Sequence, residues 1–228
     1  MKWNEWTERR LSNVFQRLKR RRVDLFVEKL GLGPDDQVLD LGSEDGSYLA
    51  TYYPYPHNIT IADINEEPMK RGVEKSGLRG YRVIPVEGRL PIEDNEFDAV
   101  WCNSVIEHVT IPRDSLGEVT SAEFNTRANQ HQKEFAEEIA RIAPRYMVQT
   151  PNIHFPVESH SWLPFIAYLP HSVRYWIGQN TKKVWVKQWT ADFLLYNAKR
   201  LRSHYPDASE FVTERAVGLP KSYIALRY

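Results

Sequence analysis

The sequence alternates short apolar runs with helix-like segments between residues 37 and 150, and this alternation constrains the fold more than any other feature. Five apolar runs predict buried strands, at residues 37–41, 58–63, 81–86, 97–102 and 146–150. Apolar residues at helical spacing predict helices between them, at residues 47–53, 67–76 and 134–142. Strands that alternate with helices need βαβ crossovers, which predict a mostly parallel sheet with its ligand site at the carboxyl ends of the strands.

The two ends of the chain add further elements to this core. A long apolar stripe at helical spacing predicts a helix over residues 3–30, and residues 189–205 are also predicted to be helical. Residues 211–216 and 222–227 predict two strands joined through Gly218, which would add an antiparallel edge to the sheet. The predicted fold class is therefore α/β: a Rossmann-like, doubly wound, mostly parallel seven-stranded sheet with an antiparallel C-terminal edge strand.

We predict one domain over residues 1–228, because the length suits a single α/β core with a small lobe. It divides into an N-terminal helical region (1–34), a cofactor-binding core (35–150), an aromatic-rich acceptor or lid region (151–210) and a C-terminal strand pair (211–228).

Composition excludes several classes of function. The 30 Lys and Arg balance the 30 Asp and Glu, so no global field favours nucleic acid or an anionic membrane. The basic run from Arg17 to Arg22 lies on a helix whose other face is apolar, which favours a solvated face over a nucleic-acid contact. Cys102 is the single cysteine, so an internal disulfide and CxxC metal sites are excluded. The sequence shows neither a signal peptide nor a transmembrane stretch, so we expect a cytoplasmic protein without membrane insertion.

The segment from Val38 to Gly46 turns a strand sharply into a helix. Its glycines permit unusual backbone angles and close approach of a ligand, and the helix N-terminus offers free N–H groups. About twenty residues further on, Asp63 ends the next strand, where a carboxylate can bind two ribose hydroxyls. The loop and the acid together predict a nucleotide-like ligand.

Several motifs in the same order resemble the class I S-adenosylmethionine-dependent methyltransferases, close to the small-molecule "type 11" domains. Val38-Leu39-Asp40-Leu41-Gly42 resembles their first motif, and the stretch at 61–65 their ribose-binding acid. Residues 90–100 are similar to the family's LPFxDxxFDxV stretch, and 103–109 to its xSVLEHV ending. The resemblance covers about residues 35–150, and the stretches 149–165 and 218–222 resemble one subgroup of these domains.

This resemblance implies S-adenosylmethionine as cofactor, S-adenosylhomocysteine as product and a set of cofactor-binding residues. The predicted set is Asp40, Gly42, Ser43, Gly46, Asp63, Ile64, Glu87, Gly88, Arg89, Asn103 and Ser104. Two positions depart from the family pattern. Glu44 replaces the central glycine of the usual GxGxG, and the stretch before the fourth strand is one residue short, which leaves Glu87 to bind the adenine amine and Arg89 to line the ring.

Three histidines are candidates for a catalytic base, since a neutral imidazole can accept a proton near pH 7. His108 lies just beyond the fourth predicted strand and is the first choice, with His160 and His154 after the fifth strand as alternatives; each could instead be a structural residue. A metal site formed by His154, Glu158 and His160 is the less favoured interpretation, and no metal is predicted. Aromatic residues between 162 and 176 could wall an apolar acceptor pocket or pack a C-terminal lobe.

The predicted function is methyl transfer to the oxygen or nitrogen of a small-molecule acceptor, such as a metabolite, glycan or natural product. The alternatives are an RNA or protein methyltransferase and a non-catalytic protein that keeps the fold. The sequence at 102–105 lacks an Asn/Asp-Pro-Pro-Tyr motif, which disfavours base N-methylation, so no nucleic-acid partner is expected. Residues 110–130 are interpreted as a lid or specificity loop, or as a solvated insertion. The oligomeric state is left open.

Overall fold

The computed structural model describes residues 5–158, 160–181, 185 and 189–228, with the backbone alone for residues 5–15. Its strands are β1 (Val38–Leu41), β2 (Ile59–Asp63), β3 (Gly80–Val83), β4 (Ala99–Asn103), β5 (Arg145–Pro151), β6 (Glu210–Ala216) and β7 (Leu219–Arg227). Its α-helices are α1 (Glu5–Leu30), α2 (Ser47–Tyr52), α3 (Glu66–Ser76), α4 (Ser121–Ile142), α5 (His171–Thr181) and α6 (Ala198–His204). Short 3-10 turns are η1 (Pro56–Asn58), η2 (Ile106–His108), η3 (Arg113–Ser115) and η4 (Ile166–Tyr168).

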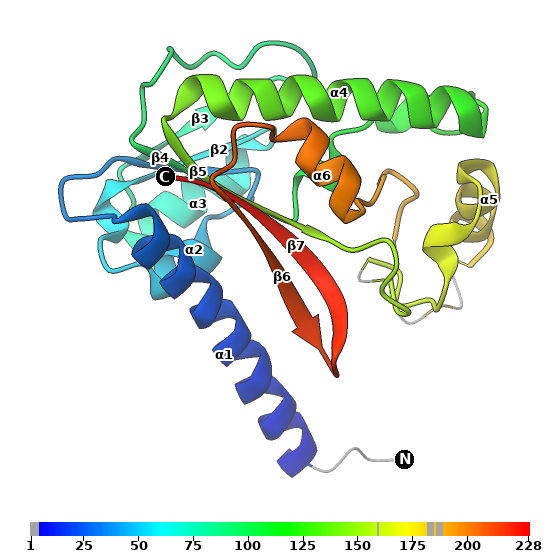
Figure 1. Cartoon of the computed structure of the whole chain (residues 1–228), viewed down its shortest axis with the longest axis horizontal. Helices are drawn as coiled ribbons and strands as arrows, with labels where there is room; N and C mark the ends of the chain where they lie inside the picture. Colours follow the sequence, from blue (N-terminus) through cyan, green and yellow to red (C-terminus); the bar gives the residue numbers. More distant parts are fainter. Residues whose placement is uncertain (1–4, 159, 182–184, 186–188) are drawn as a thin grey trace.

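The seven strands form one sheet in the order β3-β2-β1-β4-β5-β7-β6 (Figure 1). Strands β1 to β5 pair in parallel, while β7 pairs antiparallel with both β5 and β6. The predicted Rossmann-like α/β fold is confirmed. The C-terminal hairpin supplies the antiparallel strand, and β7 lies between β5 and the edge strand β6.

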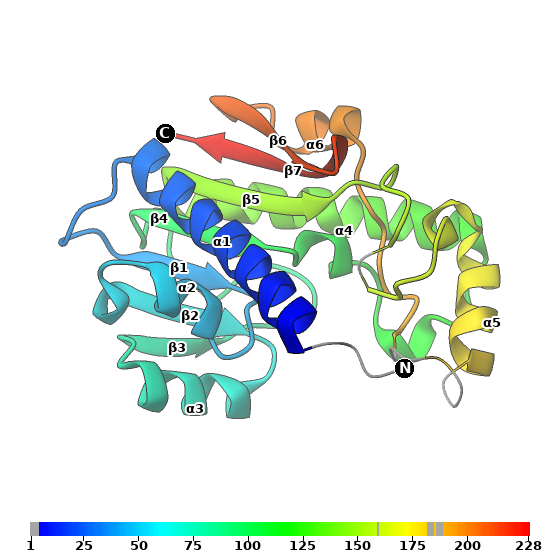
Figure 2. The same cartoon turned by 90° about the horizontal axis from the view of Figure 1, so that it is seen from below.

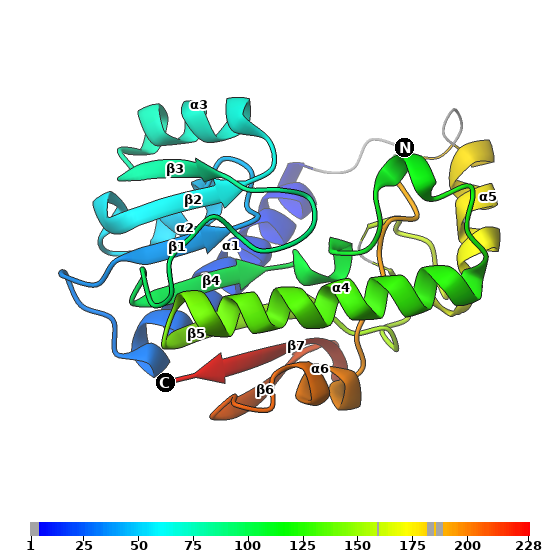
Figure 3. The same ribbon diagram turned by 90° about the horizontal axis from the view of Figure 1, so that it is seen from above.

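Helices cover both faces of the sheet. Figure 2 looks onto the face that carries α1 and α2, and Figure 3 onto the opposite face, where α4 and α6 lie in front of the strands. Each face has its own apolar core because successive strand residues point to opposite sides: Val38 packs on the α1 side and Leu39 on the α4 side. This double cover explains the continuous apolar runs in the strand sequences.

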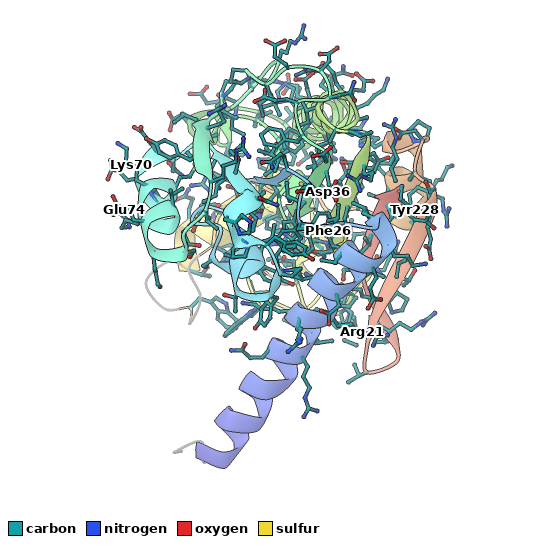
Figure 4. The ribbon with its side chains drawn as sticks, turned by 90° about the vertical axis from the view of Figure 1, so that its left-hand side faces the viewer. Arg21, Phe26, Asp36, Lys70, Glu74 and Tyr228 are labelled. Atoms are coloured by element: carbon teal, nitrogen blue, oxygen red, sulfur yellow. The ribbon has the colours of Figure 1, made fainter. Side chains whose placement is uncertain are left out.

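The predicted N-terminal helix is confirmed from Glu5 to Leu30, while Trp3 lies outside the described residues. The C-terminal part of α1 packs on the sheet through Val23 and Phe26, which are fully buried. Figure 4 shows the N-terminal part of the helix extending away from the body, with the Arg21 side chain pointing outward. Within the basic run, Arg17, Lys19, Arg20 and Arg21 are exposed, as a solvated face requires, but Arg22 is not.

Helix α4 begins much earlier than predicted. It starts at Ser121 rather than Glu134, so residues 121–130 are helix and not part of a loop. A capping box fixes this start: the Thr120 hydroxyl accepts from the Glu123 amide, and the Glu123 carboxylate accepts from the Thr120 amide. The signal Thr-x-x-Glu was present in the sequence. Only residues 110–120 form the connector.

The helix predicted over residues 189–205 is wrong in its first half. Helix α6 spans only Ala198–His204, with Asn197 as its N-cap. The residues before it run in an extended course, and their alternate side chains are buried: Trp189, Ala191, Phe193 and Leu195. A burial period of two belongs to extended chain and not to helix.

The described residues between 152 and 197 form a lobe beyond the carboxyl ends of the parallel strands, with α5 at its outer limit (Figure 2). Its small core joins Ile166 to the extended segment through Phe193 and Leu195. The lobe therefore stands where a parallel sheet binds its ligand. Among the described residues no helix is long and apolar enough to cross a membrane; the cytoplasmic location and the division into four regions stay predictions.

Candidate active site

The loop between β1 and α2 is built around two glycines with left-handed backbone angles. Gly42 has φ 80° and Gly46 has φ 65°. A side chain at Gly42 would overlap Val105 in the loop after β4, and one at Gly46 would meet Ile61 of β2. The Gly42 amide donates to the Ala62 carbonyl over 2.7 Å. The loop after β1 and the loop after β4 are thus in direct contact.

Glu44, which replaces the family's central glycine, keeps the backbone of a glycine. Its φ is 59°, in the left-handed region that disfavours a side chain by about 1–2 kcal/mol. The side chain is exposed, and its amide donates to Asp63 Oδ2 over 3.1 Å. The loop therefore has the course that a glycine would give it, and the carboxylate of Glu44 extends into solvent.

Asp40 is a fully buried carboxylate at the carboxyl end of β1. Neither of its oxygens accepts a hydrogen bond from a described residue, and the Ser43 hydroxyl nearby is also unpartnered. Burial raises the pKa of Asp40 to about 7, and the negative charges of Asp45 and Asp63 act in the same direction. A buried acid without a partner is costly, so this position suits a cationic or hydrogen-bonding ligand.

Asp63 ends β2 and is buried, with its two oxygens held in place by the backbone. Oδ2 accepts from the Glu44 amide, and Oδ1 accepts from the Asn65 amide over 3.0 Å. These contacts fix the carboxylate beside the glycine loop, while the neighbouring Ile64 side chain is half-exposed. A fixed carboxylate at the end of this strand can accept hydrogen bonds from adjacent hydroxyls of a ribose.

Asn103 and Ser104, at the end of β4, belong to a polar network that also includes Arg22 of α1. Arg22 Nη1 donates to Asn103 Oδ1 over 2.7 Å and to Gln149 Oε1 over 3.2 Å. The Ser104 hydroxyl donates to the same Gln149 oxygen over 2.8 Å. On its other side Arg22 forms a two-pronged ion pair with Glu214 of β6. The N-terminal helix is thereby tied to three strands at the mouth of the site.

The predicted adenine-binding stretch lies on the surface beyond β3. Glu87 is exposed and approaches His131 of α4, with 3.6 Å between Oε1 and Nδ1. Gly88 has φ 89°, and Arg89 pairs with Asp94 over 3.1 Å rather than with the loop. The structure places this stretch on the β3 side of the sheet, and the adenine role of its residues stays a prediction.

His108 and His160, the first two candidate bases, lie against each other. Their ring centroids are 4.5 Å apart at an interplanar angle of 89°. His108 ends η2, just beyond the Val105 that touches Gly42, while His160 comes from the lobe after β5 and stacks on Phe193. Two imidazoles from distant parts of the sequence therefore meet beside the loop that is predicted to bind the cofactor.

Each histidine of this pair has its own buried carboxylate. His160 Nδ1 lies 2.5 Å from Glu158 Oε1, and His108 Nδ1 lies 3.6 Å from Asp192 Oδ1. Burial works against the charge of both acids, but His160, through its ring and its backbone amide, and the Ser161 side chain lower the pKa of Glu158 to about 2, and His108 lowers the pKa of Asp192. Burial would lower the pKa of His108, yet Asp192 and Glu107 outweigh it and raise that pKa above the usual value.

The third candidate base, His154, lies apart from this pair. It is exposed, and its Nδ1 lies 3.2 Å from the Tyr168 hydroxyl. Trp162, Phe165, Tyr168 and Trp176 are largely exposed, so they form an outer surface of the lobe rather than a closed acceptor pocket. The structure thus groups His108 with His160 and leaves His154 outside the group.

Three acidic residues at this site were missed or given another role by sequence reasoning. Glu107 is fully buried close to both histidines, and its Oε1 lies 3.7 Å from His160 Nε2. Asp192 comes from the extended segment that was predicted to be helical, and Glu158 was interpreted as a helix cap or metal ligand. Glu107 stood next to a candidate, but no sequence signal pairs residues 192 and 108.

Comparison with known proteins finds similarity to methyltransferases. Residues 39–122 match the family described as "Methyltransferase domain". The chain is 24% identical over 166 residues to a ubiquinone biosynthesis O-methyltransferase of Hahella chejuensis, an alignment that covers 68% of this chain and 66% of the relative. For the homologous enzyme of Bordetella pertussis the identity is 26% over 54% of this chain and 58% of the relative. The chain thus spans just under two thirds of the first relative's length and less of the second's.

Solved structures share the fold. A SAM-dependent methyltransferase from Aquifex aeolicus superposes with a TM-score of 0.53 at 16% identity, over 99% of this chain and 98% of that one. The geranyl diphosphate C-methyltransferase of Streptomyces coelicolor gives 0.59 at 11% identity, over 99% and 84%. Residues 39–122 thus match a methyltransferase domain, and these solved structures show that the chain shares the fold of S-adenosylmethionine-dependent methyltransferases.

The loop residues fit S-adenosylmethionine. The orphaned carboxylate of Asp40 is suited to the cofactor's positive charge, and Asp63 is fixed where a ribose can reach it. The glycine backbone at Gly42 leaves room for no side chain, and Glu44 directs its own away. The individual contacts of these residues with the cofactor stay predictions.

Proposed function

We propose that this protein transfers the methyl group of S-adenosylmethionine to a hydroxyl of a small-molecule acceptor. The acceptor would lie between the loop after β4 and the lobe of residues 152–197. The observation that carries this proposal is the pair His108 and His160, each backed by a buried carboxylate, beside the glycine loop. The names of the relatives, O-methyltransferases of ubiquinone biosynthesis, support oxygen as the methylated atom and a small molecule as the acceptor.

In this mechanism the cofactor, when bound, supplies an activated methyl group on its sulfonium. Asp40, Asp63, the loop after β1 and the residues at the end of β4, Asn103 and Ser104, would hold it. His108 and His160 orient the acceptor hydroxyl and receive or relay its proton. The lobe covers the reacting atoms, which limits the access of water.

An RNA or protein acceptor receives less support from the surface. The exposed cations of the basic run, Arg17, Lys19, Arg20 and Arg21, lie on α1, on an element other than the strand ends. The feature that would favour a non-catalytic role is Glu44 in place of a glycine. Its side chain extends away from the loop, so this support is weak.

The proposal is tested by calorimetry with S-adenosylmethionine and by S-adenosylhomocysteine formation with a panel of phenols, aliphatic alcohols and amines. We expect binding of the cofactor and turnover with a hydroxyl acceptor. Asp63→Ala should weaken cofactor binding by roughly 10- to 100-fold, since a charge-assisted hydrogen bond contributes about 1.5–3 kcal/mol. Asp207→Ala, a carboxylate paired with Arg227 away from the loop, is the matched control. Absence of binding at high micromolar cofactor would refute the enzyme assignment, and turnover with amines alone would refute oxygen as the acceptor atom.

A further inference from the structure

Glu107, His108 and His160 bring three metal-ligand groups to one point. One carboxylate oxygen and one ring nitrogen from each histidine lie within 4.8 Å of one another. This is the one such group found among the described residues. In a tetrahedral site with bonds of about 2.1 Å the donor atoms lie about 3.4 Å apart. The three side chains therefore need to close by little more than 1 Å to share one ion.

Glu107 supplies the second observation that points to a ligand. The residue is 0% exposed, and its Oε2 accepts from the Thr150 hydroxyl over 2.9 Å. Its Oε1 accepts no hydrogen bond from any described residue and lies 3.7 Å from His160 Nε2. A buried carboxylate with one unsatisfied oxygen is expensive, and a cation beside it removes that cost.

His160 is held as a metal ligand usually is, while His108 has a carboxylate 3.6 Å from its Nδ1 without a hydrogen bond to it. A ligating imidazole normally gives its other nitrogen to a carboxylate or carbonyl, which fixes the ring and its tautomer. Glu158 stands behind His160, and its own oxygens accept from the amides of His160 and Ser161 over 2.7 and 2.6 Å. Asp192 stands behind His108 and is itself fixed by Thr190 and Arg113.

From this geometry we infer that Glu107, His108 and His160 bind a divalent first-row transition metal ion. Two imidazoles and one carboxylate suit zinc, iron, cobalt or nickel, whereas magnesium and calcium prefer an all-oxygen set. Three protein ligands leave at least one position open, which is the pattern of catalytic rather than structural metal sites.

The open position gives the ion a role in the reaction, and this step rests on the proposed function. With the ion bound, His108 and His160 act as its ligands instead of as bases. A hydroxyl of the acceptor at the open position would be acidified by the cation and lose its proton to solvent. Its oxygen then forms a bond to the sulfonium methyl while the S–CH3 bond breaks, and the bonding pair stays on sulfur. The acceptor class is accordingly a hydroxylated small molecule whose reacting oxygen can bind a metal.

The experiment uses the full chain, stripped with a chelator and then titrated with Zn²⁺ alone by calorimetry and with Co²⁺ alone by visible absorption. We expect one equivalent to bind, with the absorption of nitrogen- and oxygen-ligated cobalt. The variants Glu107→Gln and His160→Asn should each weaken binding by about 100-fold or more, and Glu158→Gln by about 10- to 100-fold. His154→Asn, an exposed histidine of the same lobe, is the matched control and should bind as the parent chain does. Thermal unfolding with and without Zn²⁺ confirms that each variant is folded, and only chains that bind should gain stability.

Equal zinc affinity in the parent chain, Glu107→Gln and His160→Asn would overturn the inference, as would the absence of binding at millimolar metal. Methyl transfer that persists unchanged in the stripped protein would overturn the role of the ion in the reaction but would leave the proposed function intact. Failure of the proposed function has its own signature, because S-adenosylmethionine would then not bind whatever the metal content.

Discussion

The cofactor loop and the acceptor side of the site are built in different ways. The loop from Gly42 to Gly46 is shaped by its backbone: left-handed angles, amide contacts to Ala62 and Asp63, and the close approach of Val105. The acceptor side depends on side chains, since His108 and His160 are held by carboxylates from distant segments. The first half is encoded locally and the second half only by the tertiary fold, so mutations should affect them by separate routes.

The largest effect is expected from Asp40, the buried acid near the carboxyl end of β1. Because the pKa of Asp40 is near 7 in the folded protein and near its ordinary value when unfolded, the native state holds an extra proton between about pH 4 and 7. Stability therefore falls as the pH rises through this window. Between pH 5 and 8 the fall amounts to about 3 kcal/mol.

Asp40→Asn should remove this dependence while weakening cofactor binding. The measurement is urea unfolding of both chains at pH 5 and pH 8, compared as a difference between the two proteins. If the parent and the variant lose equal stability over that range, Asp40 is not the buried acid that the structure shows.

The next largest effect is expected at the contact between α3 and the cofactor loop after β1. A side chain at Gly72 of α3 would overlap the carbonyl of Asp45, whereas Gly80 in β3 faces open space. Gly72→Ala should destabilise the protein by about 1–3 kcal/mol through overpacking, less the gain of about 1 kcal/mol in helix propensity, and should weaken cofactor binding. Gly80→Ala should change neither quantity appreciably. Urea unfolding midpoints measure the stability of the two variants, and calorimetry measures their cofactor affinity. Equal cofactor affinities in the two variants would show that α3 does not support the cofactor loop.

The acceptor side is tested through Asp192. Asp192→Asn removes the charge behind His108 and one partner of Arg113, so turnover should drop by about tenfold through misplacement of the imidazole. Cofactor affinity should stay at the parental value because the glycine loop is untouched. Asp207→Asn provides the control for loss of a surface carboxylate. A parallel fall in cofactor affinity would show that the two halves of the site are coupled.

The smallest effect is expected at Glu44. Glu44→Gly relieves the left-handed backbone, about 1–2 kcal/mol, and adds chain entropy to the unfolded state, so a net gain of about 0.5–1 kcal/mol is expected. Val217→Gly, another left-handed residue in the exposed β6–β7 hairpin, should give a similar gain. Glu44 lies in the cofactor loop and Val217 does not. An equal change in cofactor affinity in both variants would therefore contradict the assignment of the cofactor site to this loop.

The predictable part of the molecule is the part whose signals are local. The apolar runs that end in Gly42 and Asp63 predicted two strands and the loop at their ends. These elements depend on hydrophobic periodicity and on turn-forming residues, which are visible in the local sequence. The early start of α4 was also encoded locally, by Thr120 and Glu123, and was missed because the surrounding polar sequence has little apolar stripe.

The acceptor side could not be predicted to the same degree. Trp189 to Leu195 alternate with a period of two, but a single segment without a partner strand gives no strong signal, and a helix was predicted there instead. That error hid Asp192, whose place beside His108 depends on a separation of more than eighty residues. Arg22 was assigned to a solvated face for the same reason, since no signal in the sequence around it indicates a contact with Glu214 or Asn103.

The Arg22 network has a consequence for how the protein is made. Arg22 lies near the start of the chain, and its main partner, Glu214, lies 192 residues later on a strand near the end. During synthesis the N-terminal helix leaves the ribosome long before β6 and β7 exist, so its cation has no counter-charge to bind. The mouth of the site can close only after the last hairpin has joined the sheet. We therefore expect the contact between α1 and the β6–β7 hairpin to form after β1 to β5 have been synthesised.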